Sequence, residues 1–61
     1  MLSLSLPIEL LVSILNTYLR SKYDNLESLC EYEDLSYEDL LSKLIQNDYV
    51  YNIELNQIKI K

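Results

Sequence analysis

The spacing of apolar residues changes near residue 48, from a helical period to a period of two. Before this point apolar side chains recur three or four residues apart, which is typical of one face of an α-helix. After it, apolar and polar residues alternate, as they do in a β-strand with one buried face. The pattern predicts helices over residues 7–22, 25–33 and 37–46, followed by a β-hairpin over residues 49–60.

The first helix has a wide apolar face. Pro7 suits its first position, where a missing N–H costs nothing. The polar residues form one narrow stripe, made of Glu9, Ser13, Asn16, Thr17 and Arg20. Apolar residues fill the remaining arc of about 200°, roughly twice the stripe expected for a helix docked on one side. The helix is therefore predicted to lie at the centre of the fold, to contact another chain, or both.

The second and third helices carry local start signals and are predicted to form a helix-turn-helix from Asp24 to Ile45. In a capping box, side chains at the helix start satisfy free backbone N–H groups of the first turn. That spacing is found in Asp24 with Glu27 and in Ser36 with Asp39, and Leu35 with Leu40 has the spacing of a hydrophobic staple. The predicted buried residues are Leu26, Leu29 and Cys30 in one helix and Leu40, Leu41, Leu44 and Ile45 in the other.

The sequence contains no glycine, so any backbone position with positive φ must use Asn or Asp. Asn47 is predicted to be the left-handed residue that closes the third helix. The absence of glycine also excludes the glycine-rich loops that bind phosphate groups.

Two registers are open for the hairpin. In the first, Tyr51 lies opposite Ile58, residues 53–56 form the loop, and Tyr49 and Ile60 share the same face. In the second, Val50 lies opposite Ile58 and the tyrosines point outward. The first register is preferred because it buries two aromatic side chains instead of one valine.

These elements predict a single small α+β domain over residues 1–61, mostly helical. Three helices followed by a hairpin form the architecture of a winged helix. Residues 1–6, with a leucine at every second position from Leu2, are expected to be a short strand paired with the hairpin or a loosely held N-terminus.

Composition limits the chemistry. With one cysteine and no histidine, the chain has no internal disulfide and none of the usual zinc ligand sets. The net charge is −5, and the segment from Asp24 to Asp39 holds seven acidic residues and no basic one. No basic n-region precedes the apolar N-terminal stretch, which Glu9 interrupts, and no stretch reaches the roughly 20 apolar residues of a membrane span. A cytoplasmic protein is expected.

Several short motifs resemble one protein family. They are Asn16-Thr17-x-Leu19-Arg20, Leu26-Glu27-x-Leu29-Cys30, Leu40 to Leu44, Tyr49-x-Tyr51 and Asn56-Gln57. Together they resemble domain of unknown function 4250, over about residues 6 to 58. The sequence departs from that family at Leu6, where the family has Asp before the proline, and at Asp48, where glycine is common. The resemblance implies a compact, bacterial, cytoplasmic domain and implies no activity.

An enzyme is not expected. The carboxylate pairs Glu31 with Asp34 and Glu38 with Asp39 have the chemistry for acid–base catalysis, but that role needs a cleft that shifts their pKa values. A solvated helix face explains them more simply. Cys30 has no base or cation nearby in the sequence, so it is interpreted as a small buried residue. No cofactor or metal is predicted.

A non-enzymatic protein-interaction module, forming a homodimer or binding another protein, is the preferred function. The candidate contact residues are Asn16, Arg20, Asn56, Gln57, Leu10, Ile14 and Tyr18. The simpler explanations are that Arg20 pairs with Asp24 or Glu27 near the helix end and that Asn56 and Gln57 only shape the hairpin turn.

Two alternatives concern nucleic acids. In a winged helix-turn-helix regulator, the third helix would enter the major groove with Tyr37, Glu38 and Asp39 first, followed by Ser42, Lys43 and Gln46. Carboxylates at that position repel phosphates, and Lys59 and Lys61 in the wing are too few to compensate. The second alternative is an inhibitor whose acidic face mimics nucleic acid. Neither nucleic-acid binding nor membrane binding is expected.

Overall fold

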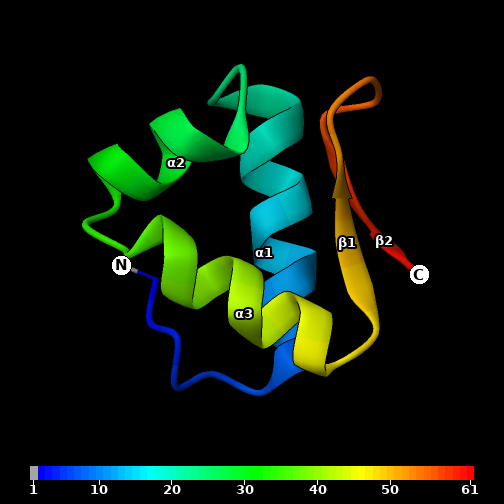
Figure 1. Cartoon of the computed structure of the whole chain (residues 1–61). Helices are drawn as coiled ribbons and strands as arrows, with labels where there is room; N and C mark the ends of the chain where they lie inside the picture. Colours follow the sequence, from blue (N-terminus) through cyan, green and yellow to red (C-terminus); the bar gives the residue numbers. More distant parts are fainter. Residues whose placement is uncertain (1) are drawn as a thin grey trace.

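A computed structural model describes residues 2–61, which form three α-helices followed by a two-stranded antiparallel sheet (Figure 1). The elements are α1 (Ile8–Ser21), α2 (Leu26–Tyr32), α3 (Tyr37–Gln46), β1 (Tyr49–Asn52) and β2 (Gln57–Ile60). Each bound lies within one residue of the predicted one. The predicted class, α+β and mostly helical with a C-terminal hairpin, is confirmed.

The helix α1 runs through the middle of the molecule (Figure 1). The helix α2 lies beside both α1 and α3, β2 lies beside α1, and β1 lies beside α3. Side chains of all three helices share one core. Leu11 and Leu15 of α1 are fully buried at the centre of the core. The other buried side chains are Leu2, Val12, Leu19, Leu26, Leu29, Cys30, Leu40, Leu44 and Ile58. The wide apolar arc of α1 is therefore mostly covered by the rest of the chain.

The helix starts differ in detail from the predicted ones. Pro7 is the N-cap of α1 and not its first residue, and its carbonyl accepts the first helical hydrogen bond, from Leu11 N–H (2.9 Å). The N-cap of α2 is Asn25, whose Oδ1 accepts the N–H of Ser28 (2.8 Å). The cap predicted at Asp24 is wrong because α2 begins at Leu26, which places Asp24 one residue too early. Ser36 caps α3 as predicted.

Within residues 2–61, three residues have positive φ: Asp34 (58°), Asp48 (64°) and Asn56 (52°). Each joins two elements, and all are Asp or Asn, as the lack of glycine requires. Asn47, predicted to be left-handed, has a φ of −109°. The helical hydrogen bonding continues one residue further than predicted, since Asp48 N–H still bonds to Ile45 O (3.1 Å). The left-handed position therefore falls on Asp48, where glycine would carry no steric cost.

The N-terminal segment is neither a strand nor loosely held. Residues 2–6 form a turn, with Leu6 N–H bonded to Ser3 O (3.3 Å), and they lie away from the hairpin (Figure 1). Leu2 is 5% exposed, and Leu4 and Leu6 pack partly against the core. The alternating leucines are explained by this docking on the helices, which needs no strand partner. Met1, the first residue of the predicted range 1–6, lies outside the described residues.

The preferred hairpin register is confirmed: Tyr51 lies opposite Ile58 and Asn52 opposite Gln57. Tyr49 and Tyr51 pack against the core, while Ile60, on the same face at the open end of the hairpin, is 76% exposed. Ile45 of α3 is also exposed, contrary to prediction. It lies about 100° around the helix from Leu44, beyond the face that Leu40 and Leu44 bury.

Candidate functional site

In residues 2–61 there is neither a pocket nor a group of three or more His, Cys, Asp or Glu side chains close enough to hold a metal ion. The candidates in this part of the chain are therefore surfaces. The sequence proposed one such surface, built from Asn16, Arg20, Asn56, Gln57, Leu10, Ile14 and Tyr18. In the structure some of these residues form hydrogen bonds within the chain, and others are exposed.

Asn16 holds the hairpin to α1. Its Nδ2 donates to the carbonyl oxygen of Ile58 (3.1 Å), and its Oδ1 accepts the N–H of the same residue (2.7 Å). The sheet has two strands, so both are edge strands with backbone groups that no third strand satisfies. The amide of Asn16 takes the place of that missing strand at Ile58. Its role is structural, and its polar atoms are occupied.

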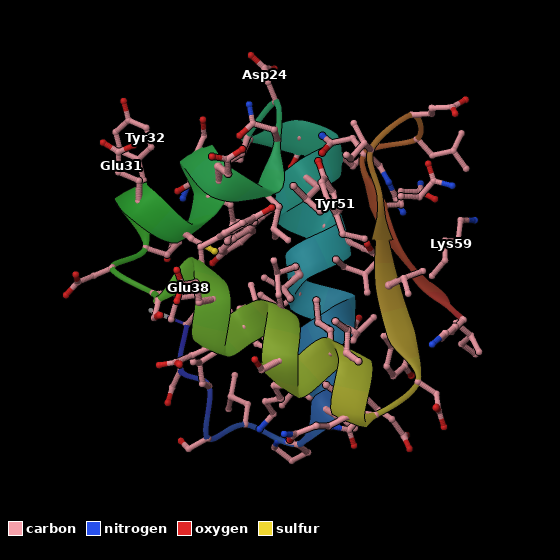
Figure 2. The ribbon with its side chains drawn as sticks, in the orientation of Figure 1. Asp24, Glu31, Tyr32, Glu38, Tyr51 and Lys59 are labelled. Atoms are coloured by element: carbon pink, nitrogen blue, oxygen red, sulfur yellow. The ribbon has the colours of Figure 1, made fainter. Side chains whose placement is uncertain are left out.

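Asn56 holds the hairpin loop to the end of α1. Its Nδ2 donates to the carbonyl oxygens of Leu19 (2.9 Å) and Tyr23 (3.2 Å). Its Oδ1 accepts the hydroxyl of Tyr51 (2.5 Å), and that hydroxyl oxygen in turn accepts the N–H of Leu26 at the start of α2 (3.3 Å). In Figure 2, Tyr51 points from the sheet toward the helices. One side chain thus connects α1, β1 and, through Tyr51, α2.

The remaining polar candidates are Gln57 and Arg20, and their contacts show no function for either side chain. Gln57 is half-buried and lies opposite Asn52 in the sheet. Arg20 is exposed, and in residues 2–61 it forms no ion pair, so the predicted pairing with Asp24 or Glu27 is wrong. The ion pair at this end of α1 joins Lys22 to Glu33.

The exposed side of α1 carries no charge over a continuous stretch, which we name the α1 outer face. It consists of Leu10, Ser13, Ile14, Thr17, Tyr18 and Ser21. Leu10 is 48% exposed, and Ile14 and Tyr18 are partly buried. At 3.6 residues per turn, Ile14 lies about 160° around the helix from Asn16. The predicted apolar candidates therefore form a surface of their own, separate from the asparagines.

A group of aromatic side chains extends from Tyr18 across the junction of α1 and α2. Tyr18 meets Tyr23 edge-on (6.1 Å between ring centroids), and Tyr23 stacks on Tyr32 (5.9 Å). Figure 2 shows Tyr32 projecting outward from the end of α2. Lys22 and Glu33 complete this tyrosine cluster. The sequence interpretation missed it, although the order of Tyr18, Lys22, Tyr23 and then Tyr32-Glu33 was a usable signal once two adjoining helix ends were expected.

Glu33 organises the tyrosine cluster electrostatically. Its Oε2 accepts the hydroxyl of Tyr23 (2.6 Å) and lies 3.8 Å from Lys22 Nζ. The hydrogen bond to this carboxylate raises the pKa of Tyr23 to about 12, since ionisation of the phenol would break the bond and place two negative charges together. Burial raises the pKa of Cys30, which fits its interpretation as a small core residue.

The pKa of Tyr23 predicts a loss of stability in strong base. The folded state holds this proton more tightly than the unfolded state, where the ordinary pKa is 10.0. The stabilisation is therefore complete below pH 10 and is lost as the pH rises toward 12. We expect the urea midpoint of the native chain to fall more between pH 9.5 and 11.5 than that of Tyr23→Phe. Equal decreases in the urea midpoints of the two proteins would show that the loss of stability does not come from Tyr23. Tyr37, whose pKa burial also raises, is present in both proteins and cancels in the comparison.

The acidic residues at the helix ends do not form one site with the residues of α3, the helix considered above for DNA recognition. Glu31, Asp34, Glu38 and Asp39 are all exposed, and Figure 2 shows Glu31 projecting outward from α2. Lys43, the lysine of α3, donates from Nζ to the carbonyl oxygen of Leu4. Its charge is used to hold the N-terminal segment against α3.

Comparison with known proteins agrees with the resemblance seen in the motifs. No curated protein and no solved structure matches the chain. Among residues 2–61, none of the helices has the length and apolar character needed to cross a membrane. One family model matches residues 7–58, which is most of the chain and all five elements except the final residues of β2. The chain therefore belongs to the family described as Domain of unknown function (DUF4250).

Proposed function

We propose that this chain is a small protein-interaction module that forms a homodimer through the α1 outer face. The observation that carries the proposal is that none of the six residues of that face is charged, in a chain of net charge −5. The ammonium of Lys22 lies over the Tyr18 ring, at one end of the face. Two copies that meet through any acidic surface would place like charges together, which costs free energy. Two copies that meet through the α1 outer face avoid this repulsion.

Two hydroxyl groups on the α1 outer face, those of Thr17 and Ser21, already have partners within the helix. Thr17 Oγ1 donates to Ser13 O (3.0 Å), and Ser21 Oγ donates to Thr17 O (2.9 Å). A polar group that already has a partner loses less when water is removed from it. The small side chains of Ser13, Thr17 and Ser21 also allow a second helix to approach closely. This face is therefore suited to desolvation against a copy of itself.

The size of the surface sets the expected affinity. The helix has 14 residues and is about 21 Å long. A single helix face of this length buries less than the roughly 800 Å² per partner of a standard stable interface. We therefore expect a dissociation constant in the micromolar range and an exchange between monomer and dimer within ordinary working concentrations.

The charges do not favour the DNA-binding alternative. The third helix would present exposed Glu38 and Asp39 to the phosphates, and the charge of its Lys43 is engaged by Leu4. Neutralisation of phosphates by Lys and Arg supplies most of the affinity in DNA binding. For the nucleic-acid mimic, an exposed acidic face is the one supporting feature, and acidic helix faces are common without that role.

Sedimentation equilibrium over a wide concentration range tests the dimer. Thr17→Arg places a cation at the centre of the α1 outer face on both copies, so we expect its dimer dissociation constant to rise at least tenfold. Thr17 is exposed, and arginine is a better helix former than threonine, so the fold is retained. The matched control is Ile53→Arg, which adds the same charge at the exposed hairpin loop and should leave the dimer unchanged.

Two results would overturn the proposed dimer. One is a native chain that stays monomeric at millimolar concentration. The other is a dimer that Thr17→Arg and Ile53→Arg weaken equally, since that would show that the effect does not depend on the α1 outer face.

A further inference from the structure

We propose that the tyrosine cluster is a binding site for a cationic side chain, arginine or lysine, of a basic protein segment. In the folded chain Lys22 occupies this site from within. Its Nζ lies 4.9 Å from the centroid of the Tyr18 ring and 5.6 Å from that of Tyr23, both within the range of a cation–π interaction. Two aromatic faces and one carboxylate around a cation are the chemistry by which proteins recognise organic ammonium and guanidinium groups.

The carboxylate of the site is fixed in place, whereas its present cation is not. The side chain of Glu33 is 12% exposed, and the Tyr23 hydroxyl holds its Oε2. Lys22 is 57% exposed, and its ammonium lies 3.8 Å from that oxygen, beyond hydrogen-bond distance. Because its lysine is mostly exposed, we expect this pair to contribute no more than about 1 kcal/mol. An incoming cation therefore has little to displace.

The surroundings of the site favour a basic partner. Glu31 and Asp34 flank the cluster in sequence and are exposed, and the segment from Asp24 to Asp39 contains no base. Tyr32, stacked on Tyr23 and 76% exposed, offers an aromatic surface beside the carboxylate. A planar guanidinium would stack on such rings and use both carboxylate oxygens, which an ammonium does not. Arginine is therefore the preferred ligand.

Removal of the internal cation provides the test. Lys22→Ala should bind N-acetylarginine amide saturably, with shifts of the Tyr18 and Tyr23 ring signals in NMR spectra. Loss of a competitor worth about 1 kcal/mol should tighten this binding about fivefold relative to the native chain. N-acetylcitrulline amide, which has the same shape without the charge, should cause no saturable shift. Lys22→Gln is a second route to the same comparison.

The position of the binding carboxylate is tested in the Lys22→Ala background. Adding Glu33→Gln keeps an oxygen that accepts the Tyr23 hydroxyl but removes the charge, and we expect at least a tenfold loss of affinity for the arginine probe. Adding Glu31→Gln instead removes one charge from the exposed side of the same helix and should weaken binding less than twofold.

Three outcomes would overturn the site: no saturable shift in Lys22→Ala or Lys22→Gln, equal responses to the arginine and citrulline probes, or equal effects of Glu33→Gln and Glu31→Gln. The inference does not rest on the proposed dimer. Its readout is the ring signals of the monomer at low protein concentration, whereas the dimer test measures the mass of Thr17→Arg.

Discussion

Asn56→Ala is expected to destabilise the fold by about 3–5 kcal/mol. It removes the hydrogen bonds to Leu19 O and Tyr23 O and leaves the Tyr51 hydroxyl without its acceptor. Unsatisfied groups of this kind cost about 1–3 kcal/mol each where they are buried. Alanine at a φ of 52° adds about 1–2 kcal/mol of steric cost. A chain of 61 residues has a total stability of roughly 3–9 kcal/mol, so most of it would be lost.

The contributions of conformation and hydrogen bonding at this position are separable. Asn56→Gly removes the same side-chain bonds but suits the left-handed backbone. We expect it to be about 1 kcal/mol more stable than Asn56→Ala in urea unfolding, and still well below the native chain. If Asn56→Gly were as stable as the native chain, Asn56 would serve only as a turn residue, as one sequence interpretation had it.

Asn16→Ala is expected to cost about 2–4 kcal/mol, because the N–H and C=O of Ile58 both lose their partner at the sheet edge. The loss should be concentrated in the hairpin. Amide hydrogen exchange of β1 and β2 should accelerate more than that of α2 and α3, since the sheet would retain its own ladder but not its connection to α1.

The matched control for Asn16 is its neighbour on the helix. Thr17→Ala removes a hydrogen bond within the exposed surface of α1 and should change stability by no more than about 0.5 kcal/mol. Equal urea midpoints for the two variants would show that the amide of Asn16 does not anchor β2. A uniform loss of exchange protection over the whole chain would show that the hairpin cannot loosen on its own.

Most of the fold could be predicted from the spacing of apolar residues along the chain. The apolar spacing located all three helices within one residue of their bounds, because burial of one face is what stabilises short helices in so small a domain. The register of the hairpin followed from the same consideration. Only the pairing of Tyr51 with Ile58 places the tyrosines against the helices, and a slip of one residue would have exposed both.

The polar contacts between residues far apart in the chain could not be predicted from the sequence. Asn16 was placed on a polar, solvent-facing stripe, whereas it bonds to Ile58, 42 residues away in the chain. The sequence predicts that Asn56 either shapes the hairpin turn or contacts a partner. Its side chain instead bonds to Leu19 and Tyr23, which are more than 30 residues away in the chain. Side-chain periodicity describes which face is apolar but not which backbone groups an amide will meet. The tyrosine cluster was missed for a different reason: its residues are close in the sequence, but they meet only because the ends of α1 and α2 adjoin.

The burial of Leu2 affects how this protein is handled in the laboratory. Leu2 lies in the core and Lys43 bonds to the carbonyl oxygen of Leu4, so a bulky group attached to the N-terminal segment would disturb both contacts. Lys61, at the other end, is fully outside the core. Purification tags, fluorophores and surface tethers are therefore better attached after Lys61, where they disturb neither the packing of Leu2 nor the contact of α3 with the N-terminal segment.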